Sequence, residues 1–127
     1  MQKKFLFEYA VIRVMPRVER EEFLNVGIIL YCAKQKFLKS IFTIDEKKIK
    51  IFTPETNVNE IEENLLALQR ISSGSKGSGT IGAYDMASRF RWLTATRSTV
   101  IQCSKVHPGF CADAQQTLIK LHEHLVL

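Results

Sequence analysis

Three arginines fall within ten residues and form a group of side chains able to bind an anion. They are Arg89, Arg91 and Arg97, with Trp92 among them and Ser98 directly after them. A guanidinium group holds a phosphate or a carboxylate through paired hydrogen bonds, and an aromatic ring beside it adds a flat platform. The group therefore predicts a site for a phosphate, a carboxylate or an acidic protein surface. An internal role stays open, in which Trp92 anchors the core and one arginine pairs with Asp85.

A charged stretch between the first two apolar segments is the second candidate region. Residues 16–22 are too charged to be buried, and they begin with a proline, which cannot donate a backbone hydrogen bond to a sheet. We interpret them as a hairpin connection that presents Arg17, with Asn25 just beyond it. The glutamates of this stretch could act as acid and base, but arginines lie among them. A solvated hairpin of mixed charge is the interpretation we favour.

The cysteines and His107 have a spacing that metal ligands can share. Cys103, His107 and Cys111 follow one another at equal intervals, and Cys32 ends a neighbouring predicted strand. A zinc ion bound by three cysteines and one histidine is therefore one interpretation. The spacing is looser than that of the usual paired zinc knuckle, and a core of this size does not need zinc to fold. We favour small buried cysteines, and we expect no metal and no cofactor.

Three apolar segments joined by short connections predict an antiparallel meander. Residues 5–15 are apolar on both sides, which is typical of an interior strand. Residues 23–32 form a second strand, in which Gly27 marks a bulge or a close approach, and residues 37–44 form a third. A β-branched run at residues 98–102 adds a fourth strand.

The remaining segments have helical signals. Asp45 can cap a short lysine-rich turn, Asn57 with Glu60 forms a capping box, and Asp113 with Gln116 forms another capping pair. A further helical piece begins near Met86. Residues 72–80 are rich in glycine and serine and predict a flexible loop; they lack the spacing of a phosphate-binding loop. The sequence thus predicts an α+β fold, in which helices pack on one side of a mostly antiparallel sheet of about four strands.

Composition limits the classes of protein to which the chain can belong. With 127 residues, of which 46% are hydrophobic, residues 1–127 fit a single domain. The net charge of +5 is modest for a nucleic-acid binder, and we interpret the lysines between residues 34 and 50 as a solubilising edge. No apolar run approaches the roughly 20 residues of a membrane helix. An odd cysteine count without a C-x-x-C pair favours a reducing cytoplasm.

Several long motifs are spread over nearly the whole chain. Residues 9–27 read Tyr-Ala-Val-Ile-Arg-Val-Met-Pro-Arg-Val-Glu-Arg-Glu-Glu-Phe-Leu-Asn-Val-Gly, and later motifs are Arg-Phe-Arg-Trp-Leu at 89–93 and Arg-Ser-Thr-Val-Ile-Gln at 97–102. These motifs closely resemble a bacterial family labelled domain of unknown function 3037. The family pattern includes His107 followed by Gly109 but no cysteine at position 103, which weakens the zinc interpretation. The resemblance implies no established activity. Genes of this family often lie beside one for a HipA-like kinase, which the resemblance suggests as a partner.

Two functions from different classes follow. The first is a non-enzymatic interaction or regulatory module that binds a HipA-like kinase through residues 17–25 and 89–107. The alternative is a small enzyme or binder that acts on a phosphorylated or nucleic-acid ligand. In that alternative His107 is the general acid or base, and Arg89, Arg97 and Ser98 hold the anion.

Overall fold

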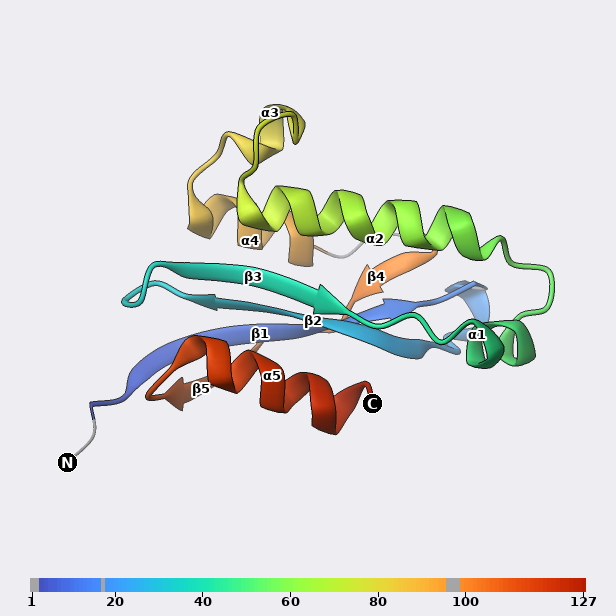
Figure 1. Cartoon of the computed structure of the whole chain (residues 1–127), viewed down its shortest axis with the longest axis horizontal. Coiled ribbons are helices and arrows are strands. Elements are labelled where there is room, and N and C mark those ends of the chain that lie inside the picture. The colour runs from blue at the N-terminus through green and yellow to red at the C-terminus, as the bar shows by residue number, and fades with distance from the viewer. Residues whose placement is uncertain (1–2, 17, 96–98) are drawn as a thin grey trace.

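A five-stranded antiparallel sheet forms the centre of the protein in a computed structural model, which describes residues 3–16, 18–95 and 99–127. Its strands are β1 (Phe5–Val14), β2 (Leu24–Cys32), β3 (Phe37–Phe42), β4 (Ile101–Cys103) and β5 (His107–Cys111). The helices are α1 (Glu46–Phe52), α2 (Val58–Ser73), α3 (Gly79–Gly82), α4 (Met86–Thr94) and α5 (Ala114–Leu125), and a 3-10 helix η1 (Val18–Arg20) follows β1. The predicted α+β class is confirmed (Figure 1).

β1 is the strand to which most of the sheet is attached. It pairs with β2 along one edge, and with β4 and β5 in succession along the other, and all three pairings are antiparallel. Ala10 and Ile12 of β1 belong to one buried cluster, whereas Phe7 and Val11 belong to another. The prediction of an interior strand that is apolar on both sides is therefore confirmed.

The irregularity predicted at Gly27 is present. The pairing of β1 with β2 shifts register at this point, where Ile12 lies opposite Gly27 and Arg13 lies opposite Asn25. A Cβ atom on Gly27 would lie 2.5 Å from the carbonyl oxygen of Ile41, so only glycine fits between β1 and β3 here.

The end of the sheet formed by β4 and β5 differs from the prediction. The strand expected at residues 98–102 is β4, at Ile101–Cys103, and Ser98 lies outside the described residues. β5 is an additional strand. It contains Pro108 and Gly109, which both disfavour strands, so no local pattern indicated it. A Cβ atom on Gly109 would lie 2.6 Å from the Phe7 ring, so a larger residue there would have to displace this buried ring.

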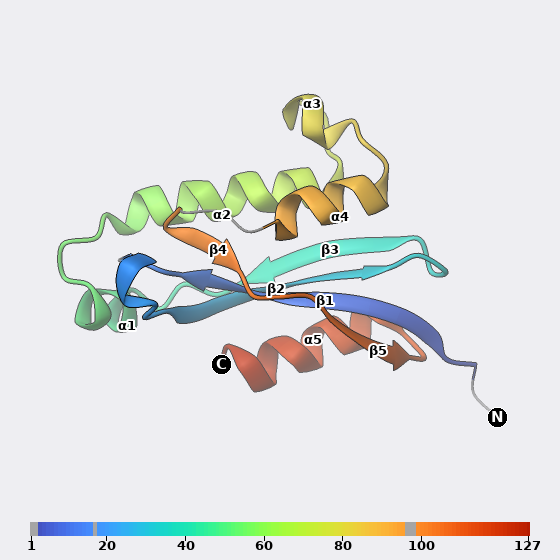
Figure 2. The ribbon, with the colours of Figure 1, turned by 180° about the vertical axis from the view of Figure 1, so that it is seen from behind.

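The helices cover both faces of the sheet, whereas the sequence predicted helices on one side. α2 and α4 lie over one face, where they close a cluster centred on Phe90, Ile12 and Leu65. α5 lies against the opposite face and closes a second cluster through Leu118 and Ala114 (Figures 1 and 2). The physical reason is the apolar character of β1 and β2 on both sides, which leaves two faces to be removed from water.

The predicted helix starts are confirmed. The side chains of Asp45, Asn57 and Asp113 each accept hydrogen bonds from backbone N–H groups in the first turns of α1, α2 and α5. The loop predicted at residues 72–80 is shorter than expected, because Ser72 is buried within the last turn of α2, with its hydroxyl 2.8 Å from that of Ser40. Gly74 then ends α2 in the left-handed conformation, and the short helix α3 begins at Gly79.

In the part of the chain that the structure describes, no helix is both long and apolar enough to cross a membrane.

Candidate interaction surface

The predicted site residues that the structure describes lie on opposite faces of the sheet. Asn25 pairs with Arg13 and His107 pairs with Tyr9, and these side chains lie on the face that carries α5. Arg89 and Trp92 belong to α4, which covers the other face. Arg17, Arg97 and Ser98 fall outside the described residues. The structure therefore does not bring Arg89 and His107 together, as the enzymatic alternative requires.

Arg89 stabilises the fold from within. Only 9% of this residue is exposed, and its Nη1 atom donates to the backbone carbonyl of Tyr84. The guanidinium group also packs against Gly74, where a Cβ atom would lie 3.1 Å from its Cζ atom. Asp85, the acid considered as an arginine partner, accepts from the backbone N–H of Ser88 at 2.7 Å, and this hydrogen bond lowers the pKa of Asp85. Arg89 thus joins the start of α4 to the end of α2.

Arg91, by contrast, lies on the outer side of α4. Its Nη1 and Nη2 atoms lie 2.7 and 3.2 Å from the two carboxylate oxygens of Glu8 on β1. This two-pronged pairing raises the pKa of Arg91, chiefly through the hydrogen bonds to Glu8. The pair fixes α4 to the interior strand β1 and leaves both partners partly accessible to solvent.

Asn25 and Arg13 also make contacts within the protein. The Asn25 Nδ2 atom donates to the carbonyl of Leu125 at 3.0 Å and so holds the last turn of α5. The Arg13 guanidinium lies 3.9 Å from the centre of the Phe23 ring, a cation–π contact at the base of the β1–β2 connection.

The four proposed zinc ligands are divided between the two faces. Cys103 packs against the cluster under α2 and α4, whereas Cys32 and Cys111 belong to the cluster under α5. Burial raises the pKa of the Cys111 thiol, with a further contribution from Cys32. The His107 ring lies 5.3 Å from that of Tyr9. Among the described residues, no group of three or more histidine, cysteine or acidic side chains could hold a metal ion.

The lysines of residues 34–50 are divided as well. Lys34 and Lys36 lie in the turn between β2 and β3, at one end of the molecule, and Lys47, Lys48 and Lys50 lie on α1 at the other end (Figure 1). They therefore do not form one basic surface.

Exposed apolar side chains lie on β5 and β1 and on α4, which the Arg91–Glu8 pair joins to β1. Phe110 of β5 is 70% exposed and lies directly opposite Leu6 of β1, which is 51% exposed. Glu8 follows on the same face of β1 and leads to α4 through its pair with Arg91. On α4, Trp92 is 39% exposed, and Tyr84 just before the helix is 43% exposed.

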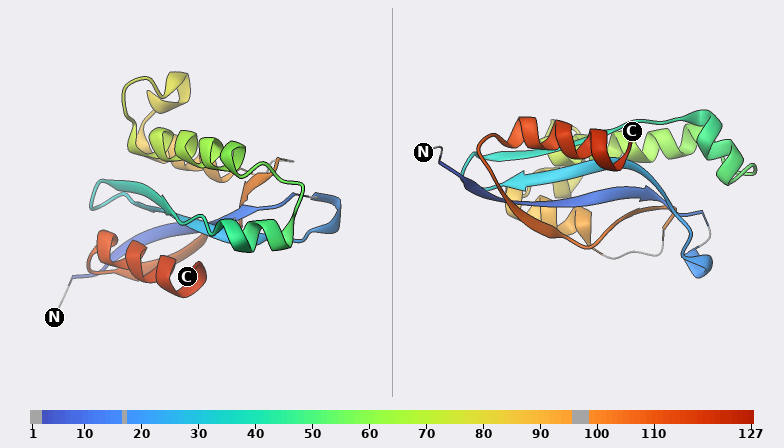
Figure 3. Two further views of the ribbon diagram at one scale, coloured as in Figure 1. Left: turned by 45° about the vertical axis from the view of Figure 1, so that its right-hand side comes forward. Right: turned by 90° about the horizontal axis from the view of Figure 1, so that it is seen from below.

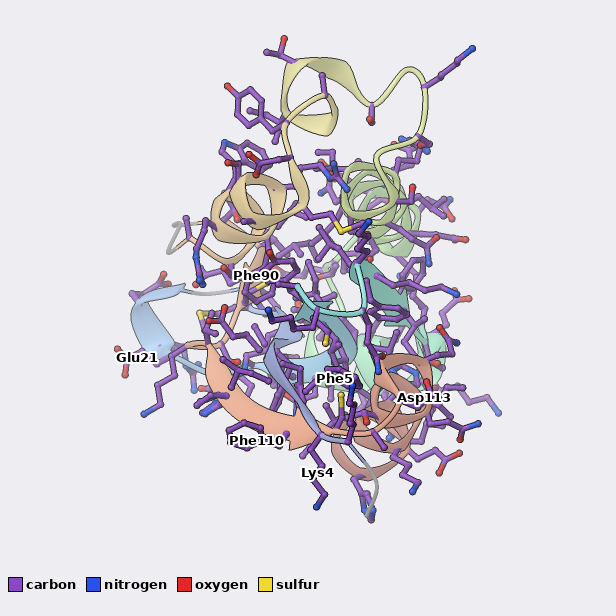
Figure 4. All side chains as sticks on the ribbon, turned by 90° about the vertical axis from the view of Figure 1, so that its left-hand side faces the viewer. Lys4, Phe5, Glu21, Phe90, Phe110 and Asp113 are labelled. Atoms are coloured by element: carbon purple, nitrogen blue, oxygen red, sulfur yellow. The ribbon has the colours of Figure 1, made fainter. Side chains whose placement is uncertain are left out.

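We name this region the α4–β5 face. It comprises Leu6, Glu8, Tyr84, Arg91, Trp92 and Phe110. A shallow hollow on it is lined by Tyr84, Asp85, Ala87, Ser88, Arg91 and Trp92. Figures 2 and 3 show α4 and β5 in the half of the molecule that contains the N-terminus, α4 above the sheet and β5 below β1 in Figure 2, and Figure 4 shows Phe110 pointing outward from β5. Arg91 and Trp92 are the members of this face that the sequence indicated as candidates for anion binding. The exposed positions of Leu6 and Phe110 depend on β5, which no local pattern indicated.

Comparison with known protein families shows a family to which the chain belongs. The family model described as "Protein of unknown function (DUF3037)" matches residues 9–126. No curated protein and no solved structure matches the chain.

Proposed function

Because the chain belongs to the DUF3037 family, whose description assigns no activity, we propose a function from the geometry: the protein is a non-enzymatic interaction module that binds another protein through the α4–β5 face. The observation that carries the proposal is the exposed Leu6–Phe110 pair, on the face of β1 that also carries the Glu8–Arg91 ion pair. Large apolar side chains that lie side by side in water mark a surface that another molecule covers.

The chemical make-up of the face fits a protein partner. Tryptophan, tyrosine and arginine are the residues that most often dominate binding energy at protein interfaces. The face holds Trp92, Tyr84 and Arg91, and the hollow beside them is shallow. A surface of this shape suits a protein better than a small molecule, because small molecules are usually bound in clefts that enclose most of their surface.

We further propose a HipA-like kinase as the partner. The support for this choice is the gene association that the family resemblance implies. Roles for Arg17, Arg97 and Ser98 in the same complex stay predictions.

Co-purification of the full chain with a HipA-like kinase tests the proposal. We expect a complex at micromolar concentrations, which Trp92→Ala and Phe110→Ala each weaken by about tenfold or more, since truncation of a hot-spot side chain costs about 2 kcal/mol or more. Ile51→Ala is the matched control, because Ile51 is 83% exposed but lies on α1, away from the face. If no complex forms, the kinase assignment is wrong. If Trp92→Ala and Phe110→Ala bind the kinase as tightly as the natural chain and Ile51→Ala do, the assignment of binding to the α4–β5 face is wrong.

A further inference from the structure

β5 has an open edge. The strand order places β1 beside β5, and no other described strand pairs with it. The outer strand on the opposite side, β3, is shielded differently: α2 packs along it, and the Gln69 side chain donates to the carbonyl of Ser40 at 3.3 Å. An open strand edge presents backbone donors and acceptors to which a further strand can bind.

The direction of the backbone groups of β5 follows from its partner strand. The carbonyl of Val11 accepts from Ser104, and the N–H of Met15 donates to Val100, so the odd-numbered residues of β1 direct their backbone groups toward β4 and β5. Tyr9 lies opposite His107, and odd-numbered residues of β5 therefore face β1 in turn. Pro108 and Phe110 are left to direct their backbone groups to the open edge.

These two residues differ in what they can offer to an added strand. Pro108 has a carbonyl group but no N–H group, and proline is tolerated at an edge for this reason. Phe110 offers both a donor and an acceptor. Its exposed ring lies beside Leu6 and provides an apolar platform for alternate side chains of an added strand.

The charges around this edge are positive. Lys105 lies just before β5, and Lys3 and Lys4 lie just before β1, at the end of β5 where Phe5 pairs with Cys111. All three lysines are exposed. Of the nearby acids, Glu8 is neutralised by its pair with Arg91, and Asp113 caps α5 through two backbone N–H groups, so the three lysines remain in excess. A segment that carries acidic residues at both ends therefore complements this edge.

We propose that β5 binds an extended, acidic segment of a partner protein, which adds to the sheet as a sixth strand hydrogen-bonded at Phe110. This inference rests on the proposed function and specifies how the α4–β5 face binds. The apolar side chains of the segment cover Phe110 and Leu6, and its acidic ends lie near Lys105 and near Lys3 and Lys4.

A synthetic peptide tests this inference without requiring the natural partner. The probe has an alternating valine and threonine core with two glutamates at each end, and a second peptide has lysines in place of the glutamates. We expect the acidic peptide to bind the full chain about tenfold more tightly than the basic one. We also expect it to slow amide hydrogen exchange at Phe110.

Two substitutions at one position separate the backbone contact from the side-chain contact. Phe110→Ala removes the ring and keeps the outward N–H group, whereas Phe110→Pro removes both and spares the backbone groups that face β1. We expect the proline variant to bind the acidic peptide about tenfold more weakly than the alanine variant. Melting temperatures of the two variants establish that both are folded.

Equal binding by the two variants, or unchanged exchange at Phe110, overturns strand addition. The kinase complex can also separate the two proposals. If Trp92→Ala weakens it, but Phe110→Ala and Phe110→Pro bind the kinase equally well, the proposed function stands and strand addition is wrong. If the natural chain binds neither the acidic peptide nor the kinase, both proposals are wrong.

Discussion

Arg91 on α4 and Glu8 on β1 are 83 residues apart in the sequence, and their side chains meet at 2.7 Å in a two-pronged ion pair. The pair connects the helix layer to the sheet at the centre of the α4–β5 face. It also neutralises an arginine that the sequence had suggested for an external anion. The exposed aromatic residues around it are therefore left as the main recognition elements of the face.

This ion pair is expected to make a small contribution to stability. The Arg91 side chain is 59% exposed, so solvent screens the attraction, and exposed pairs typically contribute about 0.2–1 kcal/mol. Arg91→Ala or Glu8→Gln should each lower the free energy of unfolding by at most about 1 kcal/mol, and a double-mutant cycle in urea should measure the coupling. A coupling that stays unchanged in high salt would contradict the assignment to a screened ion pair.

Arg89 should contribute more to the free energy of unfolding than Arg91, because it is buried. Removal of its guanidinium group leaves the carbonyl of Tyr84 without this donor and opens space beside Gly74. We expect Arg89→Ala to lower the free energy of unfolding by about 2 kcal/mol or more, clearly beyond the effect of Arg91→Ala. Urea denaturation of the two variants measures the difference. Equal losses of stability would show that Arg89 is no more important to the fold than a surface arginine.

His122 should make stability depend on pH. It is buried on α5, its Nε2 atom lies 2.7 Å from the Thr43 hydroxyl, and burial lowers its pKa. Since the folded pKa lies below the unfolded value of about 6.5, the unfolded chain takes up a proton first as the pH falls. The contribution of the neutral ring is therefore complete above the unfolded pKa, and it declines as the pH falls toward the folded pKa.

Thermal unfolding between neutral and mildly acidic pH checks this expectation. The natural chain should lose more stability over this interval than His122→Gln, while His124→Gln, at an exposed position of the same helix, should follow the natural chain. If His122→Gln and the natural chain have the same pH dependence, His122 is not the responsible group.

The parts of the fold that depend on local sequence were predictable. The caps at Asp45, Asn57 and Asp113 and the bulge at Gly27 each depend on a few neighbouring residues, and each is present. β5 was not predictable in this way, because Pro108 and Gly109 disfavour a strand and only the tertiary pairing with β1 makes one.

The candidate surface could not be predicted from the sequence either, because it too depends on tertiary contacts. A count of arginines cannot distinguish Arg89, which is enclosed between helices, from Arg91, which lies two positions further along α4 and reaches solvent. The distinction arises from the helical period, which directs these neighbours to different sides. The exposed pair formed by Leu6 and Phe110 depends on a pairing between strands from the two ends of the chain.

Hydrogen–deuterium exchange on the complex with a HipA-like kinase tests the α4–β5 face most directly. The interaction surface proposed here predicts slower exchange at residues 84–92 and 107–111 when the kinase is bound, with little change on α1. Slower exchange confined to the hairpin residues 18–25, with 84–92 and 107–111 unaffected, would contradict it.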